Sequence, residues 1–201
     1  MKVILATRNK GKASEIRNML KDTGLEILTL DDYPGIVPAP ETGLTFKDNA
    51  LIKARHAALA SGLTAIADDS GLEVDYLKGR PGVWSARYAF EGATDEENWR
   101  KLLNELEEVP GEKRGARFKC VIAIVVPGGE ERTFTGTLEG VIACKPSGKG
   151  GFGYDPVFYL PGRDKTVAGL TTEEKNSISH RAEALLKLKE WIRDRRPAAP
   201  G

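Results

Sequence analysis

The chain has 201 residues, of which 40% are hydrophobic and 29% charged, and its formal net charge is +1. This balance gives no overall attraction for a nucleic acid polymer or a membrane surface, so an anion site would have to be local. The longest apolar run, 120–126, is too short to cross a bilayer. Cys120 and Cys144 lie in strand-like runs without metal-ligand spacing. We therefore expect reduced core thiols in a cytoplasmic protein that binds neither membranes nor nucleic acid polymers.

The first half of the chain predicts alternating strands and helices. Strands are expected at 2–6 and 25–30, with a helix at 11–20 between them whose core side chains are Ile16, Met19 and Leu20. Residues 31–43 contain three prolines and predict a loop. A long helix should then begin after its N-cap Thr45 and stop at Gly62. Residues 64–77 predict a strand, a turn and a second strand, followed by a loop and a polar helix near 94–107.

The second half has a different character. Residues 116–126 and 131–144 are rich in β-formers and are joined by the turn PGGEE, which predicts a hairpin. A glycine-rich loop and a short strand follow within 145–162. A closing helix is expected at 179–195, with these side chains on its apolar face: Leu185, Leu186, Leu188 and Trp191. The whole pattern predicts an α/β protein with a mixed sheet, forming one domain over 1–195, and an unstructured tail at 196–201.

A short basic loop, residues 7–12 (TRNKGK), connects the first predicted strand to the first predicted helix. It is not a Walker A loop, because Ala6 and Ala13 stand where the motif requires Gly and Ser or Thr. The polar side chains of Thr7 and Asn9, two lysines and the free N–H groups of a helix start would nevertheless favour an anion. These residues alone leave an anion-binding loop and a plain basic turn about equally acceptable.

A second glycine-rich stretch, GKGGFG at 148–153, formally matches the dinucleotide-binding pattern. That motif must open a helix, whereas this stretch leads into Pro156 and an aromatic run typical of a strand, so we reject a Rossmann site. The glycines would instead let backbone approach a ligand, with Phe152 or Tyr154 as a stacking surface. A plain hairpin loop is the alternative.

Adjacent carboxylates, Asp68 and Asp69, follow a buried strand in IADDSG. Neighbours in an extended chain point to opposite faces, so at most one of them enters a shared pocket. A carboxylate at such a position is a common magnesium ligand or general base, and Glu41 could supply a second oxygen. Solvated or turn-capping carboxylates are the alternative.

Two further groups of polar residues are associated with predicted helices. Asn49 and Lys53 lie four residues apart on one helix face, where Asn costs some helix propensity. Lys175, His180 and Arg181 surround a helix start, where basic side chains oppose the macrodipole unless an anion compensates. A solvated lysine and a structural histidine are the ordinary alternatives.

Five ordered segments together closely resemble the inosine triphosphate pyrophosphatases, from residue 2 to about 191: LATRNKGK, ETGLTFKDNALIKARHAA, AIADDSGLEVDYLKGRPGVWSARYA, GGFGYDPVF and EEKNSISHRAEAL. One departure is Arg8, where relatives often carry Gly. The resemblance implies an elongated α/β fold with a long mixed sheet and two lobes around a central cleft, usually in a homodimer. It also implies Mg²⁺-dependent hydrolysis of dITP, ITP and XTP, which are deaminated purine nucleoside triphosphates, to the monophosphate and pyrophosphate.

The resemblance further implies roles for individual residues. Asp69 would be the general base and, with Glu41, a Mg²⁺ ligand, while Asp68 would assist through a water. The substrate-binding residues would be Thr7, Arg8, Asn9, Lys10, Gly11, Lys12, Lys53, Ser70, Phe152, Gly153, Tyr154, Asp155, Lys175, His180 and Arg181. A related pyrophosphatase for modified pyrimidine or methylated nucleotides, and a nucleotide-binding protein without catalysis, remain the alternatives.

Overall fold

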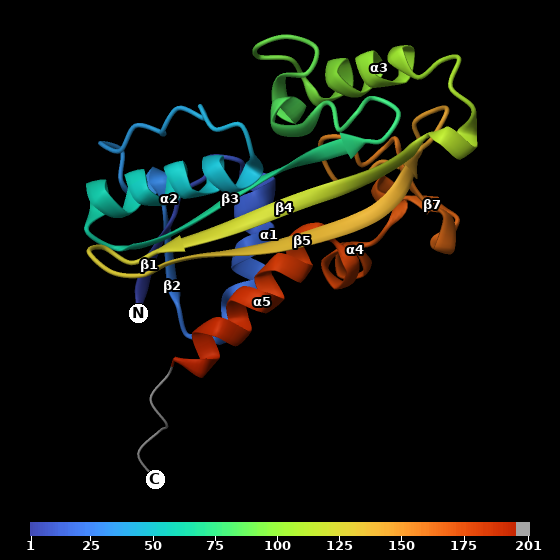
Figure 1. Ribbon diagram of the computed structural model, residues 1–201. Helices are drawn as coiled ribbons and strands as arrows, with labels where there is room; N and C mark the ends of the chain where they lie inside the picture. Colours follow the sequence, from blue (N-terminus) through green and yellow to red (C-terminus); the bar gives the residue numbers. More distant parts are fainter. Residues whose placement is uncertain (196–201) are drawn as a thin grey trace.

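The computed structural model describes residues 1–195 (Figure 1). The tail predicted to be unstructured, 196–201, lies outside the described residues. The strands are β1 (Lys2–Leu5), β2 (Glu26–Thr29), β3 (Thr64–Val74), β4 (Gly115–Val125), β5 (Glu131–Ile142), β6 (Phe158–Leu160) and β7 (Lys165–Thr166). The α-helices are α1 (Lys10–Leu20), α2 (Phe46–Ser61), α3 (Asp95–Glu105), α4 (Thr172–Ile178) and α5 (His180–Asp194). No helix within residues 1–195 is both long and apolar enough to cross a membrane.

The strands of the described chain form one mixed sheet in the order β2-β1-β3-β4-β5-β6-β7. β1 pairs in parallel with β2 and β3, while the pairs from β3 to β7 are antiparallel. Figure 1 shows α3 over one end of the long strands β3, β4 and β5, with α1, α2 and α5 around the other end. This confirms the α/β class, the mixed sheet and the hairpin of β4 with β5.

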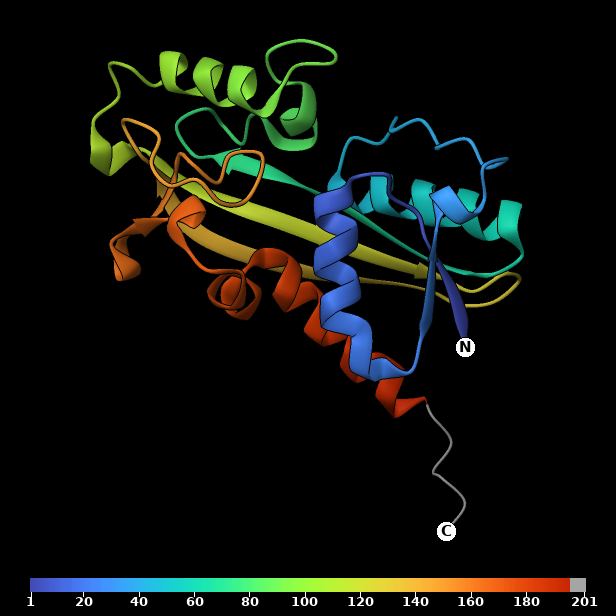
Figure 2. The ribbon, with the colours of Figure 1, turned by 180° about the vertical axis from the view of Figure 1, so that it is seen from behind.

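Helices cover both faces of the sheet. α2 packs on one face of β3 and β4, while α1 and α5 lie side by side on the opposite face (Figure 2). The alternation of β3 follows this division: Ala65 and Ala67 pack in the core under α2, whereas Ile66 packs in the core under α1 and α5. Side chains at period two along a strand must divide in this way. The alternation continues into Asp68 and Asp69, so it decides what each carboxylate meets.

The helix boundaries agree well with the sequence. Thr45 caps α2 by accepting the N–H of Asp48 at 3.1 Å, and Gly62 ends the helix in the left-handed region with φ of 69°. Asn9 caps α1 in the same manner through the N–H of Lys12 at 3.0 Å. The polar helix near 94–107 is α3, which begins with a capping box between Thr94 and Glu97.

The expected turn within 64–77 is wrong. β3 runs without interruption from Thr64 to Val74, because Ala65 through Val74 pair continuously with β4. Gly71 is required for a different reason: a Cβ there would lie 2.4 Å from Ser85 Oγ and 2.6 Å from the carbonyl oxygen of Gly82. The glycine thus lets the 3₁₀ helix Gly82–Arg87 approach the strand closely.

Two smaller expectations also fail, and one helix was missed. Leu186 is 50% exposed, so the apolar face of α5 consists of Leu185 and Leu188, which are fully buried, with Trp191 packed beside them. Cys144 is exposed beyond the end of β5, although Cys120 is a buried thiol as expected. The short helix α4 was not predicted; Thr171 and Glu174 form its capping box.

Candidate active site

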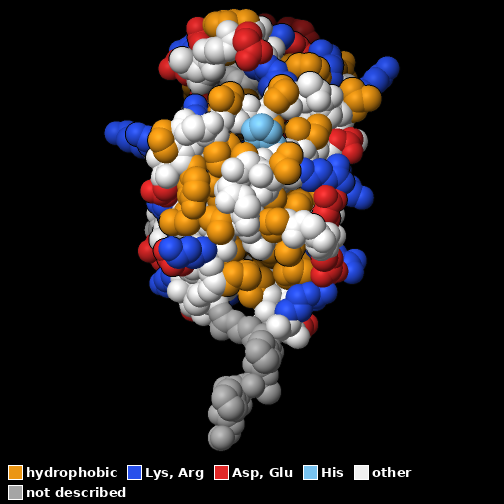
Figure 3. Space-filling model, turned by 90° about the vertical axis from the view of Figure 1, so that its left-hand side faces the viewer, with side chains coloured by type: hydrophobic (Ala, Val, Ile, Leu, Met, Phe, Trp, Pro, Cys, Tyr) orange, Lys and Arg blue, Asp and Glu red, His pale blue; other side chains and the backbone are white. Residues whose placement is uncertain are grey.

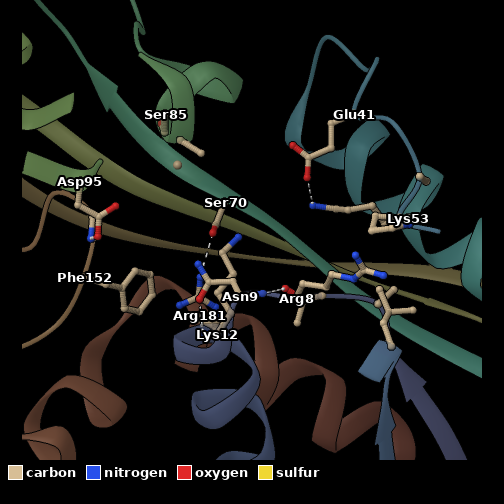
Figure 4. Close-up of a pocket in the computed structure, with 18 of the residues that line it drawn as sticks. Arg8, Asn9, Lys12, Glu41, Lys53, Ser70, Ser85, Asp95, Phe152 and Arg181 are labelled. Atoms are coloured by element: carbon tan, nitrogen blue, oxygen red, sulfur yellow. Dashed lines mark hydrogen bonds and ion pairs between the residues drawn. The ribbon is translucent and has the colours of Figure 1, made fainter. Parts of the chain in front are cut away.

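A pocket with a volume of about 330 Å³ lies between the two ends of the sheet. Its polar wall comes from the β1–α1 loop, α1, α2 and the start of α5, and its aromatic wall from β4 and the glycine-rich loop (Figure 4). Of the residues singled out in the sequence, these line it: Thr7, Arg8, Asn9, Lys12, Glu41, Lys53, Ser70, Phe152, Gly153, Tyr154, Asp155, Lys175, His180 and Arg181. Side chains from Thr7 to Arg181, almost the full length of the chain, therefore meet at one place.

Four residues with predicted roles do not line this pocket: Lys10, Gly11, Asp68 and Asp69. Lys10 is exposed at the first position of α1. Gly11 packs under the ring of Phe152, because a Cβ there would lie 3.1 Å from the ring. Asp69 is 6% exposed and binds Lys53, which itself lines the pocket.

The basic loop continues directly from the parallel strand β1 into the first turn of α1. The N–H of Asn9 donates to Thr7 Oγ1 at 3.2 Å, and Asn9 in turn caps the helix. Lys12 lies in the first turn of the helix, with its Nζ 3.1 Å from Asp68 Oδ2. A helix start and a lysine therefore converge on the same side of the pocket, an arrangement that favours an anion.

Asp69 faces α2, where it belongs to a compact hydrogen-bonded group. Lys53 Nζ lies 2.8 Å from Asp69 Oδ1 and also 2.8 Å from Glu41 Oε1. Asn49, which is fully buried, donates to Asp69 Oδ2 at 3.3 Å and accepts the N–H of Gly43 at 2.7 Å. Asn49, which is unfavourable within a helix, thus links the Asp69 carboxylate to the backbone of the loop before α2.

Burial and charge act differently on these three ionisable groups. Burial raises the pKa of Asp69 above its ordinary value, although Lys53 works against it. Burial would raise the pKa of Glu41, but Lys53, with Lys12 and Arg87, outweighs it and lowers that pKa. The pKa of Lys53 is raised since the carboxylates of Asp69, Asp68 and Glu41 outweigh its own burial. A carboxylate with a raised pKa beside a polar pocket is suited to accept a proton.

Asp68 faces the opposite side of the sheet and is almost fully buried. Its Oδ2 lies 3.1 Å from Lys12 Nζ and 3.2 Å from Arg181 Nη2, and Ser70 Oγ donates to it at 3.3 Å. Burial opposes ionisation, but Lys12 and Arg181 hold the pKa of Asp68 well below its usual range. Its Oδ1 is buried and makes no hydrogen bond within residues 1–195.

The other end of the pocket is aromatic. Lys175 Nζ lies 2.7 Å from Asp155 Oδ2 and 4.4 Å from the centroid of the Phe152 ring. His180 stacks on Phe118 with centroids 4.9 Å apart, and burial lowers the pKa of His180 well below its usual value. A neutral imidazole and flat rings suit a planar, uncharged group such as a nucleobase.

Several residues that line the pocket, or contact its lining as Glu15 does, had escaped the sequence analysis. Glu15 of α1 binds both Arg181 and Lys175, Asp95 accepts the N–H of Gly153 at 2.6 Å, and Phe118 and Ser85 line the wall. The sequence contained a weak indication of Glu15, since this residue lies three positions after Lys12 on the same helix face. Phe118 had none, because one inward aromatic residue in a strand has the same pattern as any core residue.

The molecule is an α/β protein with a pocket lined by aromatic side chains and by cationic ones, among them Lys12, Lys53, Lys175 and Arg181, which suits a small anionic ligand. Comparison with known proteins is specific. A model of the Ham1 family matches residues 3–191, and the chain belongs to this family.

Both curated relatives and solved structures agree with the family match. A dITP/XTP pyrophosphatase of Yersinia pseudotuberculosis is 52% identical over 196 residues, covering 96% of this chain and 98% of the relative. A dITP/XTP pyrophosphatase of Geobacter sulfurreducens is 52% identical over 191 residues, covering 95% and 96%. The Staphylococcus aureus Ham1 protein superposes with a TM-score of 0.88 at 41% identity, covering 98% and 100%. A HAM1 protein from Coxiella burnetii has a TM-score of 0.89 at 42% identity, covering 96% and 99%.

Proposed function

We propose that this chain is a Mg²⁺-dependent nucleoside triphosphate pyrophosphatase. It would hydrolyse dITP, ITP and XTP to the monophosphate and pyrophosphate, and so remove deaminated purine nucleotides from the precursor pool. The observation that carries the proposal is the position of Lys53, held between Glu41 and Asp69 at the edge of a pocket that also has an aromatic wall. The names and high identity of the curated relatives support the same substrates.

Glu41 and Asp69 fit a magnesium ion. Their carboxylates already surround one cation, the ammonium of Lys53. Among residues 1–195, no three His, Cys, Asp or Glu side chains form a cluster that could hold a metal. Two protein carboxylates match the usual preference of Mg²⁺, which completes its shell with phosphate oxygens and water. When bound, the ion would neutralise phosphate charge and polarise the phosphoryl oxygens.

The existing charges of the pocket explain why added positive charge would be needed. Each of these cations already contacts at least one carboxylate: Lys12, Lys53, Lys175 and Arg181. A triphosphate brings several more negative charges. The basic loop and the start of α1 would bind the phosphates through N–H groups, hydroxyls and Lys12. Lys53 would contribute its ammonium from the opposite wall.

Asp69 would accept the proton of the attacking water at a carboxylate oxygen. The water oxygen would form a bond to the α-phosphorus while the bond between that phosphorus and the α–β bridging oxygen breaks, and pyrophosphate leaves. No covalent intermediate with the protein is needed. The raised pKa of Asp69 means that its ionised carboxylate binds a proton more strongly than that of an ordinary aspartate. Its hydrogen bonds to Lys53 and Asn49 would fix the direction of the carboxylate.

The nucleobase would bind at the aromatic end. Hypoxanthine and xanthine carry a 6-keto oxygen, which accepts hydrogen bonds, whereas adenine carries an amino group that does not. Most guanidinium donors of Arg181 are occupied by Glu15, Asp68 and Ser70. His180 Nδ1 is buried and has no partner among the described residues, so it has unused hydrogen-bonding capacity. In the tautomer that carries its proton on Nδ1, this nitrogen would donate to the 6-keto oxygen, and adenine would leave it unpaired at a cost of about 1–3 kcal/mol.

We also propose that the domain covers residues 1–195 and acts as a homodimer in the cytoplasm. The pocket supports a single domain, because its residues come from both halves of the chain.

Hydrophobic side chains gather among charged ones on the face shown in Figure 3. Val37 and Leu59 are 71% and 88% exposed. An interface between two copies would cover such exposed apolar side chains, which supports the dimer. Light scattering during size-exclusion chromatography measures the mass directly.

Product analysis tests the proposed activity. The protein is incubated with Mg²⁺ and ITP, XTP, GTP or dUTP, and the products are separated. Formation of IMP and pyrophosphate from ITP supports the proposal, whereas IDP and orthophosphate would exclude attack at the α-phosphorus. Preference for dUTP would favour the pyrimidine alternative, and tight ITP binding without turnover would favour a protein that only binds nucleotides.

A further inference from the structure

Arg87 approaches the candidate site from a segment to which the sequence assigned no role. It is the last residue of the 3₁₀ helix Gly82–Arg87, on the connection between β3 and α3. Its Nη1 lies 3.7 Å from Glu41 Oε2, while Lys53 Nζ binds the other oxygen of the same carboxylate at 2.8 Å. Glu41 is therefore contacted by two cations that come from different ends of the fold.

The guanidinium of Arg87 is held in place by stacking, but its N–H donors are not all used. Its central carbon lies 4.5 Å from the centroid of the Trp84 ring, and its Nε lies 3.7 Å from Glu91 Oε2. Both of its ion pairs are too long for hydrogen bonds. Glu91 is 88% exposed, so that pair contributes little. Stacking on Trp84 leaves the edge of the guanidinium free to donate.

The buried cations of the pocket differ from Arg87 in this respect. Lys53 and Lys175 lie 2.8 and 2.7 Å from carboxylate oxygens of Asp69 and Asp155. Arg181 donates to two carboxylates and a hydroxyl. The Arg87 side chain is 20% exposed, and among the described residues it makes no side-chain hydrogen bond. Arg87 can therefore move to another partner without leaving a buried carboxylate unpaired.

We propose that Arg87 is a further phosphate-binding residue. When a triphosphate lies beside Glu41, the guanidinium leaves Glu41 and Glu91 and donates to the phosphates farther from the nucleoside. Figure 4 shows Glu41 and Lys53 on the side of the pocket away from Phe152 and Asp95. The phosphates farther from the nucleoside would lie on the side of Glu41 and Lys53. The planar fork of an arginine matches two phosphate oxygens at once. This inference rests on the proposed function for the orientation of the ligand.

The same change of partner would also stabilise the negative charge that develops on the departing pyrophosphate. The two phosphates that Arg87 contacts are those that depart as pyrophosphate, so its charge stabilises the leaving group. Pyrophosphate should therefore depend on Arg87 for binding, whereas the nucleoside monophosphate should not. This difference separates a phosphate-binding residue from one that only supports the fold.

The experiment compares Arg87→Met, Arg87→Lys and the control Arg100→Met. Arg100 is a matched residue, since it stacks 5.2 Å from the Trp99 ring and pairs with Glu96 at i−4. Neither arginine lines the main pocket, but only Arg87 forms an ion pair with a residue that does, Glu41. The readouts are inhibition of ITP hydrolysis by pyrophosphate and by IMP, and calorimetric binding of inorganic tripolyphosphate without added metal. Thermal melting checks that each variant is folded.

We expect Arg87→Met to weaken pyrophosphate inhibition and tripolyphosphate binding about 10- to 100-fold, the effect of a lost charge-assisted hydrogen bond. Inhibition by IMP should stay unchanged, Arg87→Lys should be intermediate, and Arg100→Met should behave as wild type. Unchanged tripolyphosphate binding in Arg87→Met, or an equal loss of IMP and pyrophosphate affinity, would overturn the inference. If Arg87→Met does not fold, Arg87→Lys decides by the same comparison. If the wild type fails to hydrolyse ITP, the proposed function falls, but the tripolyphosphate measurement still tests Arg87.

Discussion

Asp68 and Asp69 are neighbours in β3, yet their carboxylates meet different cations on opposite faces of the sheet. Asp69 contacts Lys53 of α2, whereas Asp68 contacts Lys12 of α1 and Arg181 of α5. The pKa of Asp69 is raised and that of Asp68 is lowered. Two adjacent residues of one type are thus suited to different tasks, one to proton transfer and the other to holding two cations.

Asp69→Asn should reduce kcat by about 10²- to 10⁴-fold, because the amide cannot accept the proton of the attacking water. Binding of ITP should be largely retained, since the substitution preserves the shape of the side chain. Steady-state kinetics and calorimetry measure the two effects separately. Full activity in this variant would show that another group is the general base.

Asp68→Asn should act mainly on stability. The change leaves Lys12 and Arg181 without their shared buried carboxylate, and we expect the free energy of unfolding to fall by about 3 kcal/mol. Chemical denaturation measures it. The control is Asp22→Asn, which breaks an exposed pair with Lys189 and should cost about 0.5 kcal/mol or less. Equal effects of the two substitutions would contradict the role assigned to Asp68.

Asn49→Ala should affect both stability and the pH profile. The N–H of Gly43 would lose its acceptor and Asp69 would lose a donor, at a cost of about 1–3 kcal/mol. Because that donor favours the ionised carboxylate, its loss should raise the pKa of Asp69 further and move the acid limb of kcat/KM to higher pH. Asn104→Ala, on the exposed side of α3, is the control. An unmoved acid limb would mean that Asn49 only supports the fold.

His180 should make the protein sensitive to mild acid. Its pKa in the folded state is lowered well below 6.5 by burial and by Arg181 and Lys175, so it stays neutral while the unfolded chain takes up a proton. The unfolded state then binds more protons, and stability falls as the pH drops below about 6.5, by at most about 1.4 kcal/mol per pH unit.

Replacing the histidine checks this source of acid sensitivity. Denaturation midpoints of His180→Gln should depend less on pH than those of the wild type between about pH 6.5 and 5. The matched control is His56→Gln, since His56 is the other histidine of the chain and is exposed. The explanation is wrong if His180→Gln and the wild type lose stability in parallel over this range.

Local chemistry made much of the fold readable from the sequence. Thr45 and Gly62 bound α2 because N-caps and left-handed glycines act within one helical turn. The β4–β5 hairpin was equally clear from two β-rich runs around a glycine turn. The continuous strand β3 was missed, because DDSG has the composition of a turn while its pairing with β4 is a long-range interaction. Local propensity is overridden where a neighbouring strand supplies the hydrogen bonds.

By itself, the sequence determined the fold class, the helix ends and, through five ordered segments, the resemblance to one family of enzymes. Only the tertiary structure decided the partners of the charges. Glu15 meets Arg181, Lys53 bridges two carboxylates, and Arg87 reaches Glu41, although each contact joins segments far apart along the chain. The physical reason is range. Capping and periodicity depend on the next few residues, whereas the energy of a charge depends on burial and on every neighbour that folding brings near it.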